Sequence, residues 1–133
     1  MDKAKTIAVN CAVVAVIAVL LIWVVTWQRQ AAQFRRGEAA LAAGDSMLAI
    51  AGYESAIHMY TPGSSTVRQA AERLWSMAEG FEKSGDSTRA LLAYRSLRSS
   101  FYAVQGLNKP GKDWIARCDE RIAVLVKNQA NQK

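Results

Sequence analysis

The longest uncharged stretch of the chain, residues 7–27, limits its possible folds more than any other feature. It reads IAVNCAVVAVIAVLLIWVVTW and contains no Lys, Arg, Asp or Glu. A helix of about 21 residues rises about 31 Å, close to the roughly 30 Å hydrocarbon thickness of a bilayer. A cleavable signal peptide has a shorter apolar region of about 7–15 residues, and the rest of this chain is too short to enclose the segment in a core. The stretch therefore predicts an uncleaved, single-pass transmembrane anchor.

The flanks of this segment carry residues typical of a membrane interface. Trp23 and Trp27 lie one helical turn apart, as in aromatic belts, and basic residues stand on both sides. The predicted interface residues are Lys3, Lys5, Trp23, Trp27 and Arg29. A short N-terminal tail with two lysines, residues 1–6, favours a cytoplasmic N-terminus in the inner membrane and a domain outside the cytoplasm. The basic residues after the anchor, which include Arg35 and Arg36, leave the opposite orientation open.

Helix-forming residues continue beyond the anchor without interruption. No Gly or Pro occurs between Trp27 and Gly37, so we expect one rigid helix from the anchor to about Ala43, ended by Gly44 and Asp45. Helical spacing of apolar residues predicts further helices at about 46–60, 66–83, 87–102 and 113–127, with a loop over 103–112 and a disordered tail over 128–133. No segment shows the alternation of a strand. The sequence thus predicts an all-α fold.

The domain contains an internal repeat with an offset of 41 residues, the separation of Gly44 and Gly85. The segments AGDSMLAIAGYESA and SGDSTRALLAYRSL, residues 43–56 and 84–97, align over this offset. Gly44, Asp45, Ser46, Ala49, Tyr53 and Tyr60 meet Gly85, Asp86, Ser87, Ala90, Tyr94 and Phe101. Each copy reads as a helix, a Gly-Asp turn and a second helix, with a small Ala facing its partner and an aromatic residue one turn later.

This pattern resembles the tetratricopeptide repeat over roughly residues 30–102. Leu74, Ala78 and Phe81 occupy the large, small and aromatic positions of that repeat before the second turn, and Gly37 and Ala40 do so less well before the first. The resemblance implies that the transmembrane helix continues into a solenoid of two antiparallel helical hairpins over residues 28–102, covered by a capping helix at 113–127.

Two features depart from the family pattern. The offset of 41 residues exceeds the family's spacing of about 34, and the expected proline is shifted to Pro62. Stacks of this kind usually need about three repeats for stability, which gives the helix at 113–127 its expected role as a cap. An unrelated five-helix bundle in which Gly-Asp turns recur by chance is the alternative.

No catalytic apparatus is recognisable in the sequence. The single histidine, His58, reads as a helix surface residue; Asp45 and Asp86 read as helix N-caps, and Thr66 opens a capping box. Cys118 falls on the apolar stripe of the last helix and reads as a core residue. Because no metal-ligand spacing or phosphate-binding glycine loop occurs, we expect no enzyme activity, metal, cofactor or small-molecule substrate. The net charge of +6 is too modest to indicate nucleic-acid binding.

A partner-binding face is the better hypothesis. In tetratricopeptide domains the first helix of each hairpin lines a concave surface on which partners dock. The resemblance assigns to that surface Phe34, Glu38, Leu41, Glu72, Trp75, Glu79 and Glu82. An exposed Trp75 amid carboxylates would suit a peptide or helix with Lys or Arg side chains and an apolar anchor. The alternative is that Trp75 is a core residue and that the glutamates form an ordinary solvated face.

These features together predict a membrane-anchored adaptor or accessory subunit that binds and positions protein partners. The layout resembles bacterial inner-membrane proteins with one N-terminal helix and a tetratricopeptide-type domain, some of which attend secretion or envelope machinery. A first alternative is a structural subunit held through its transmembrane helix, whose small residues Ala8, Ala12, Ala15 and Ala18 would permit close helix contact. A second is a cytosol-facing receptor for a peptide or targeting sequence.

Overall fold

The computed structural model describes residues 2–131 and consists of five helices. They are α1 (Asp2–Ala42), α2 (Ser46–His58), α3 (Ser65–Lys83), α4 (Ser87–Ala103) and α5 (Lys112–Ala130). No strand occurs within the described range, so the predicted all-α class is confirmed.

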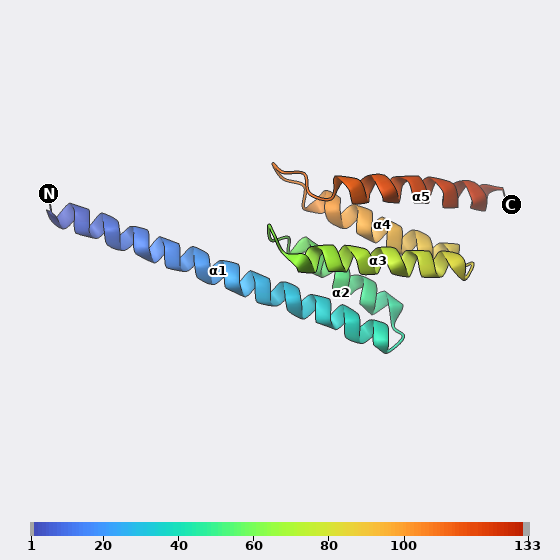
Figure 1. Ribbon diagram of the computed structural model, residues 1–133, viewed down its shortest axis with the longest axis horizontal. Coiled ribbons are helices and arrows are strands. Elements are labelled where there is room, and N and C mark those ends of the chain that lie inside the picture. The colour runs from blue at the N-terminus through green and yellow to red at the C-terminus, as the bar shows by residue number, and fades with distance from the viewer. Residues whose placement is uncertain (1, 132–133) are drawn as a thin grey trace.

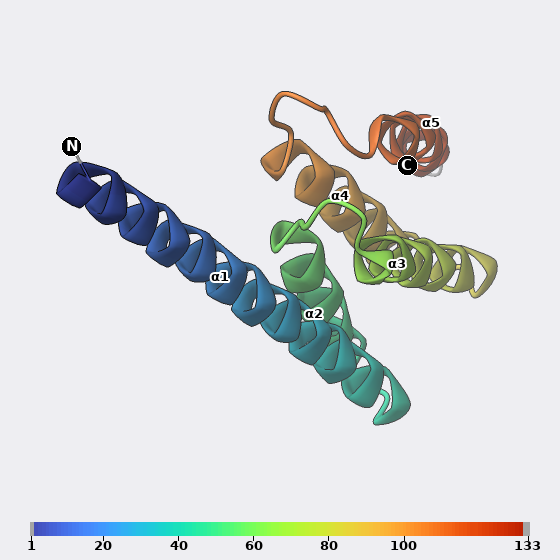
Figure 2. The ribbon, with the colours of Figure 1, turned by 60° about the vertical axis from the view of Figure 1, so that its left-hand side comes forward.

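The helices form two antiparallel hairpins followed by a fifth helix (Figure 1). The hairpins are α1–α2 and α3–α4, and α5 packs against α4. In Figure 1 the odd-numbered helices lie nearer the viewer, and α2 and α4 lie behind them. Figure 2, turned by 60°, shows α5 nearly end-on beside α3 and α4. The α2–α3 and α4–α5 connections lie at the end of the domain toward the N-terminal half of α1, whereas the tight turns within the hairpins lie at the opposite end.

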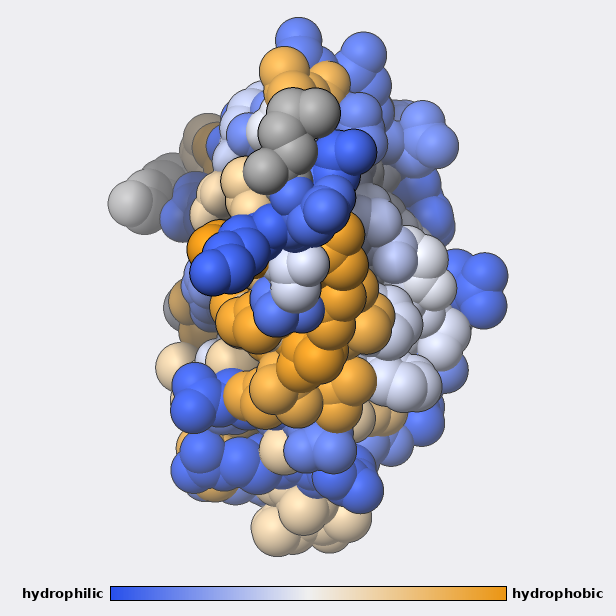
Figure 3. All heavy atoms as spheres, turned by 90° about the vertical axis from the view of Figure 1, so that its left-hand side faces the viewer, coloured by the Kyte–Doolittle hydropathy of each residue, from blue (hydrophilic) through white to orange (hydrophobic). Residues whose placement is uncertain are grey.

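Helix α1 is continuous, as the absence of Gly and Pro before Gly37 predicts. Its apolar segment, residues 7–27, is solvent-exposed along its length except at the half-buried Thr26. Figure 3, viewed toward this end, shows the apolar side chains gathered along the helix with polar residues around them. The Thr26 hydroxyl donates to the Ile22 carbonyl oxygen at 2.8 Å, which satisfies the polar group within the helix. By its length and composition α1 is able to cross a membrane.

The two Gly-Asp turns have the same geometry. Gly44 and Gly85 adopt left-handed φ values of +80° and +79°, which a residue without a β-carbon accepts without strain. Each following aspartate caps the next helix: Asp45 Oδ1 accepts from the Leu48 amide at 3.0 Å, and Asp86 Oδ1 from the Arg89 amide at 2.9 Å. Caps of this type stabilise a helix by about 1 kcal/mol. Both predicted N-caps are confirmed.

Residues that recur with the 41-residue offset form the centre of the core. Ala49 and Tyr53 on α2 are fully buried, and so are their counterparts Ala90 and Tyr94 on α4. The other fully buried apolar residues are Ala56, Ile57, Ala70, Ala71, Leu74, Ala78, Ala93, Leu97 and Cys118. Cys118 thus anchors α5 to the core, as its place on the apolar stripe predicts. Because every hairpin contributes buried Ala residues, neighbouring helices can approach closely.

Helix ends differ from the predictions in four places. Residues 2–6 continue α1, and residues 128–130 continue α5, so neither segment is the tail that the sequence suggests. Met1 and residues 132–133 of those predicted tails lie outside the described range. Helix α3 starts at Ser65 because Ser64, not Thr66, is its N-cap; the Ser64 hydroxyl accepts from the Thr66 amide at 3.2 Å. The loop before it begins earlier than expected because α2 ends at His58.

Candidate partner-binding face

The odd-numbered helices expose one common surface, which we call the α1–α3–α5 face. It consists of Phe34, Glu38, Gln69, Glu72, Arg73, Trp75, Ser76, Glu79, Glu82, Lys83, Trp114, Arg117 and Arg121. Two hollows of about 380 Å³ each indent it. One lies between α1 and α3 and is lined by Phe34, Gln69, Glu72, Arg73 and Ser76. The other lies between α3 and α5 and is lined by Glu79, Glu82, Lys83 and Arg121.

The first hollow is bordered by a hydrogen-bonded triad of Tyr53, Glu38 and Arg73. The buried Tyr53 hydroxyl donates to Glu38 Oε1 at 2.5 Å. The Arg73 guanidinium meets the same carboxylate with Nε at 2.8 Å from Oε1 and Nη2 at 3.0 Å from Oε2, a two-pronged contact. Burial, and then the hydrogen bond to Glu38, raises the pKa of Tyr53 above its usual range. Glu38 therefore ties α1 to both α2 and α3.

The second hollow is bordered by an equivalent triad of Tyr94, Glu82 and Arg121. The Tyr94 hydroxyl donates to Glu82 Oε2 at 3.1 Å, and Arg121 Nη2 donates to Glu82 Oε1. Burial first, and then the bond to Glu82, raises the pKa of Tyr94 to about 12. In both triads the tyrosine comes from the second helix of a hairpin, the glutamate from the first, and the arginine from the next odd-numbered helix.

Aromatic side chains repeat with the same offset. Phe34 packs on Tyr53 with ring centroids 5.6 Å apart, and Trp75 meets Tyr94 edge-on at 5.0 Å. Trp75 is half-buried, and its indole Nε1 donates to Glu79 Oε1 at 2.8 Å. Trp75 therefore differs from the freely exposed anchor that the sequence suggests.

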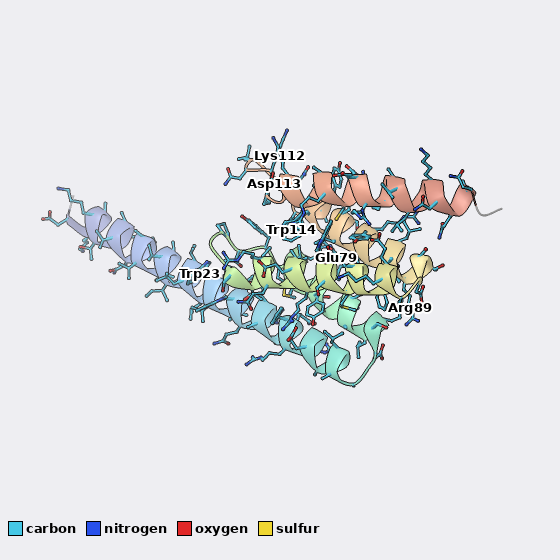
Figure 4. The ribbon with its side chains drawn as sticks, turned by 45° about the vertical axis from the view of Figure 1, so that its right-hand side comes forward. Trp23, Glu79, Arg89, Lys112, Asp113 and Trp114 are labelled. Atoms are coloured by element: carbon cyan, nitrogen blue, oxygen red, sulfur yellow. The ribbon has the colours of Figure 1, made fainter. Side chains whose placement is uncertain are left out.

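Helix α5 covers part of Trp75. The Trp114 ring centroid lies 6.0 Å from that of Trp75. The Arg117 guanidinium carbon lies 4.1 Å from the Trp75 centroid and 4.6 Å from the Trp114 centroid, within the range of cation–π contact. In Figure 4 Trp114 and Glu79 lie on the facing sides of α5 and α3. An incoming side chain at this place would meet a preformed cluster of two indoles and a guanidinium.

The structure brings six of the seven predicted face residues to the hollows or their borders. Leu41 is exposed near the end of α1 and lines neither hollow. Glu72 is exposed, and its carboxylate lies 3.9 Å from Arg68 Nε. Because the bordering carboxylates Glu38 and Glu82 are paired with arginines, the face is mixed in charge, not acidic as the sequence suggests.

Sequence reasoning missed Gln30, the only fully buried polar side chain of α1. Its Nε2 donates to the carbonyl oxygens of Ala56 at 3.1 Å and Met59 at 2.9 Å, and its Oε1 accepts from the Ser64 hydroxyl at 2.5 Å. The carbonyl oxygens at the C-terminal end of a helix have no amide donor within that helix. The Gln30 amide supplies the donor for two such oxygens at the end of α2. A signal was present: Gln30 lies seven residues before the buried Gly37 and so on the same side of α1.

The predicted interface residues lie on the exposed surface of α1. Trp23 and Trp27 stack on each other with ring centroids 5.8 Å apart. Together with the α2–α3 connection they line a cavity of about 150 Å³, whose remaining walls are Thr61, Pro62, Gly63, Ser64 and Ser65. The domain therefore reaches the level of the two tryptophans. Lys3, Lys5 and Arg29 are exposed around the same helix.

Within residues 2–131 no three His, Cys, Asp or Glu side chains gather in a group that could hold a metal ion. Burial, and next the neighbouring Asp119, raises the pKa of the Cys118 thiol to about 12, which keeps it protonated and unreactive at neutral pH. His58 is exposed. Comparison of the chain with protein-family models, curated proteins and solved structures gives no match.

Proposed function

We propose that the chain is a membrane-anchored adaptor, whose α1–α3–α5 face binds a segment of a partner protein and holds it at a fixed place beside the bilayer. Residues 7–27 of α1 serve as the anchor. Their continuous apolar surface, about 31 Å long as a helix, matches the hydrocarbon layer. The alternation of layers and the recurring Gly-Asp turns support a tetratricopeptide-like arrangement of two hairpins and a cap.

The pair of hollows between successive odd-numbered helices carries the proposal. Both are lined by residues of the α1–α3–α5 face, among them carboxylate and basic side chains. The triads fix the orientation of these walls, because each bordering glutamate is bonded to a buried tyrosine and to an arginine of the next odd-numbered helix. Ordering side chains before binding lowers the entropic cost of docking. A polypeptide with one projecting side chain for each hollow fits this surface.

The mixed charge of the face changes the expected partner. Glu72 and Arg73 line the first hollow, and Glu79 and Lys83 line the second. Such walls complement a segment that carries both acidic and basic side chains, because charge complementarity sets register and suppresses wrong partners. The Trp75, Trp114 and Arg117 cluster between α3 and α5 would receive an aromatic or aliphatic residue of the same segment.

Site-specific photo-crosslinking in native membranes tests the proposal. A photoreactive amino acid at Ser76, which lines the first hollow, should yield a discrete protein adduct, and the same residue at Ser99 on the α4 layer should not. Lys83→Glu should weaken the adduct severalfold, since it reverses the charge of one wall of the second hollow.

If the chain is instead a structural subunit held through its transmembrane helix, the expected crosslinks are different. A photoreactive residue at Ala12 would then capture the partner, Ser76 and Ser99 would not, and Lys83→Glu would have no effect. Adducts at Ser99 but not at Ser76 would contradict the assignment of the binding face.

A further inference from the structure

The α4–α5 connection, residues 104–111, has no role in the proposed partner face. It lies at the same end of the domain as the α2–α3 connection, which borders Trp23 and Trp27 (Figures 1 and 2). In Figure 4 Lys112 and Asp113 lie at this end of α5, and Trp23 lies on the neighbouring part of α1. Both connections therefore face the side on which the anchor leaves the domain.

This connection carries one exposed apolar side chain, and two lysines follow it in the sequence. Leu107 is fully exposed, with a relative accessibility of 104%, although a leucine side chain gains free energy from burial. Lys109 and Lys112 are both exposed, and Asp113 is the acidic residue beside them. An exposed apolar residue followed by two cations is a composition suited to contact with an anionic lipid surface.

The C-terminal end of the connection packs against the core, and a local turn precedes it. Gly111 has a left-handed φ of +76°, and a β-carbon there would stand 2.1 Å from Cδ1 of the buried Phe101. The Lys109 amide approaches the Gly106 carbonyl oxygen at 3.4 Å, and Lys109 itself has a φ of +40°, which is costly for a residue with a side chain. Leu107 thus lies in the turn between Gly106 and Lys109, next to the end of the connection that packs against the core.

We infer that this connection is a second membrane contact, in which Leu107 enters the headgroup layer while Lys109 and Lys112 bind the phosphate groups of anionic lipids. The inference rests on the proposed anchoring of α1. Each lysine near an anionic surface would raise the equilibrium constant for lipid binding about fivefold. With α1 as the first attachment, this second one would restrict the tilt of the domain and fix which side of it faces the bilayer.

Fluorescence of the full chain in lipid nanodiscs tests the inference. An environment-sensitive label is placed at Leu107→Cys in a Cys11→Ser background, and the buried Cys118 stays unlabelled. Ser84→Cys, exposed in the α3–α4 turn at the far end, is the matched control, and Val16→Cys reports on the anchor. Discs contain either zwitterionic lipid alone or about one third phosphatidylglycerol, with lipids that carry a spin-label quencher.

In anionic discs the label at position 107 should shift to the blue and be quenched at least about twofold more than the label at position 84. Lys109→Glu with Lys112→Glu should abolish this difference, because it removes both attractive charges. The matched double change Arg95→Glu with Lys127→Glu, at exposed positions of α4 and α5 outside the connection, gives the same net charge and should leave it intact.

Equal quenching at positions 107 and 84, with strong quenching at position 16, would overturn the second contact and leave the anchor in place. Loss of quenching at position 16 would overturn the anchor and the second contact together. Quenching at position 107 that is the same in neutral and anionic discs would refute the role of the lysines and of anionic lipid. A crosslink from position 107 to a protein in native membranes, without quenching in discs, would assign the connection to a protein partner instead.

Discussion

Gly52 on α2 lies against Gly37 on α1 so closely that a β-carbon on Gly52 would stand 2.6 Å from the Gly37 backbone nitrogen and 2.7 Å from its Cα. A β-carbon on Gly37 would in turn stand 2.8 Å from the Tyr53 ring. At the corresponding positions of the second hairpin, 41 residues on, Ala78 and Ala93 are fully buried. The first hairpin is therefore the tighter of the two, and this closeness brings Glu38 within reach of Tyr53.

Replacing Gly52 by alanine should destabilise the domain by about 2 kcal/mol, because the methyl group overlaps backbone that cannot move without shifting α1. The matched control is Gly80→Ala on α3, where a β-carbon would meet nothing within 4 Å. That change should stabilise the helix by about 0.5–1 kcal/mol. Urea unfolding in detergent, followed by circular dichroism, measures both. Equal effects of the two substitutions would contradict the close approach.

Replacing Gln30 by leucine should cost about 1–3 kcal/mol of unfolding free energy. The substitution keeps most of the side-chain volume but leaves the Ala56 and Met59 carbonyls without a buried donor. Gln28→Leu, an identical change at an exposed position of α1, should alter stability by less than about 0.5 kcal/mol. The same urea titration compares them. If the two variants unfold alike, Gln30 does not join α1 to the end of α2.

Stability should fall above pH 10 in a way that depends on Tyr94. Its pKa in the fold is about 12, above the value near 10 of the unfolded chain. Between these values the unfolded state loses the proton first, so the contribution is complete below pH 10 and declines by about 1.4 kcal/mol per pH unit as pH rises. Tyr53 and Cys118 shift in the same direction.

The contribution of Tyr94 is isolated by Tyr94→Phe, which retains the ring and removes the ionisable hydroxyl. Unfolding curves between pH 9 and pH 11.5 should show a shallower decline for this variant than for the native chain. Tyr102→Phe, which removes an exposed hydroxyl from the same helix, is the matched control. Parallel slopes for all three proteins would contradict the raised pKa.

The orientation of the chain in the membrane should be readable from Ser84→Cys in a Cys11→Ser background. With a cytoplasmic N-terminus, a membrane-impermeant maleimide should label position 84 in intact spheroplasts. Cys118 should resist labelling from either side until the protein is unfolded, because its side chain is fully buried. Labelling of position 84 only after lysis would establish the opposite orientation.

Local chemistry made much of this fold predictable. The left-handed glycines at 44 and 85 and the aspartate caps after them depend on neighbouring residues, so their sequence signals are direct. The unbroken α1 follows from the absence of breakers before Gly37. The end of α5 was harder to predict, because a polar sequence such as residues 128–130 permits a helix without demanding one.

The candidate face was only partly predictable because its glutamates form ion pairs with arginines that are far away in the sequence. Arg73 reaches Glu38 across 35 positions of sequence, and Arg121 reaches Glu82 across 39. The 41-residue offset would match Glu38 with Glu79, yet Tyr94 bonds Glu82, one helical turn further on. Periodicity placed these glutamates on the right helices, but which of them would be neutralised depends on packing between hairpins.

The continuity of α1 from Asp2 to Ala42 fixes the direction of the α1–α3–α5 face relative to the side chains of residues 7–27. Successive residues of a helix are rotated by about 100° and raised by about 1.5 Å. One residue inserted between Trp27 and Gln30 would rotate the α1–α3–α5 face by about 100° relative to residues 7–27. An insertion of about seven residues would return the face nearly to its original direction and move it by about 10 Å along the axis of α1. In the proposed membrane-anchored adaptor, the length of this short segment, more than its composition, would therefore decide which neighbour in the bilayer the domain faces.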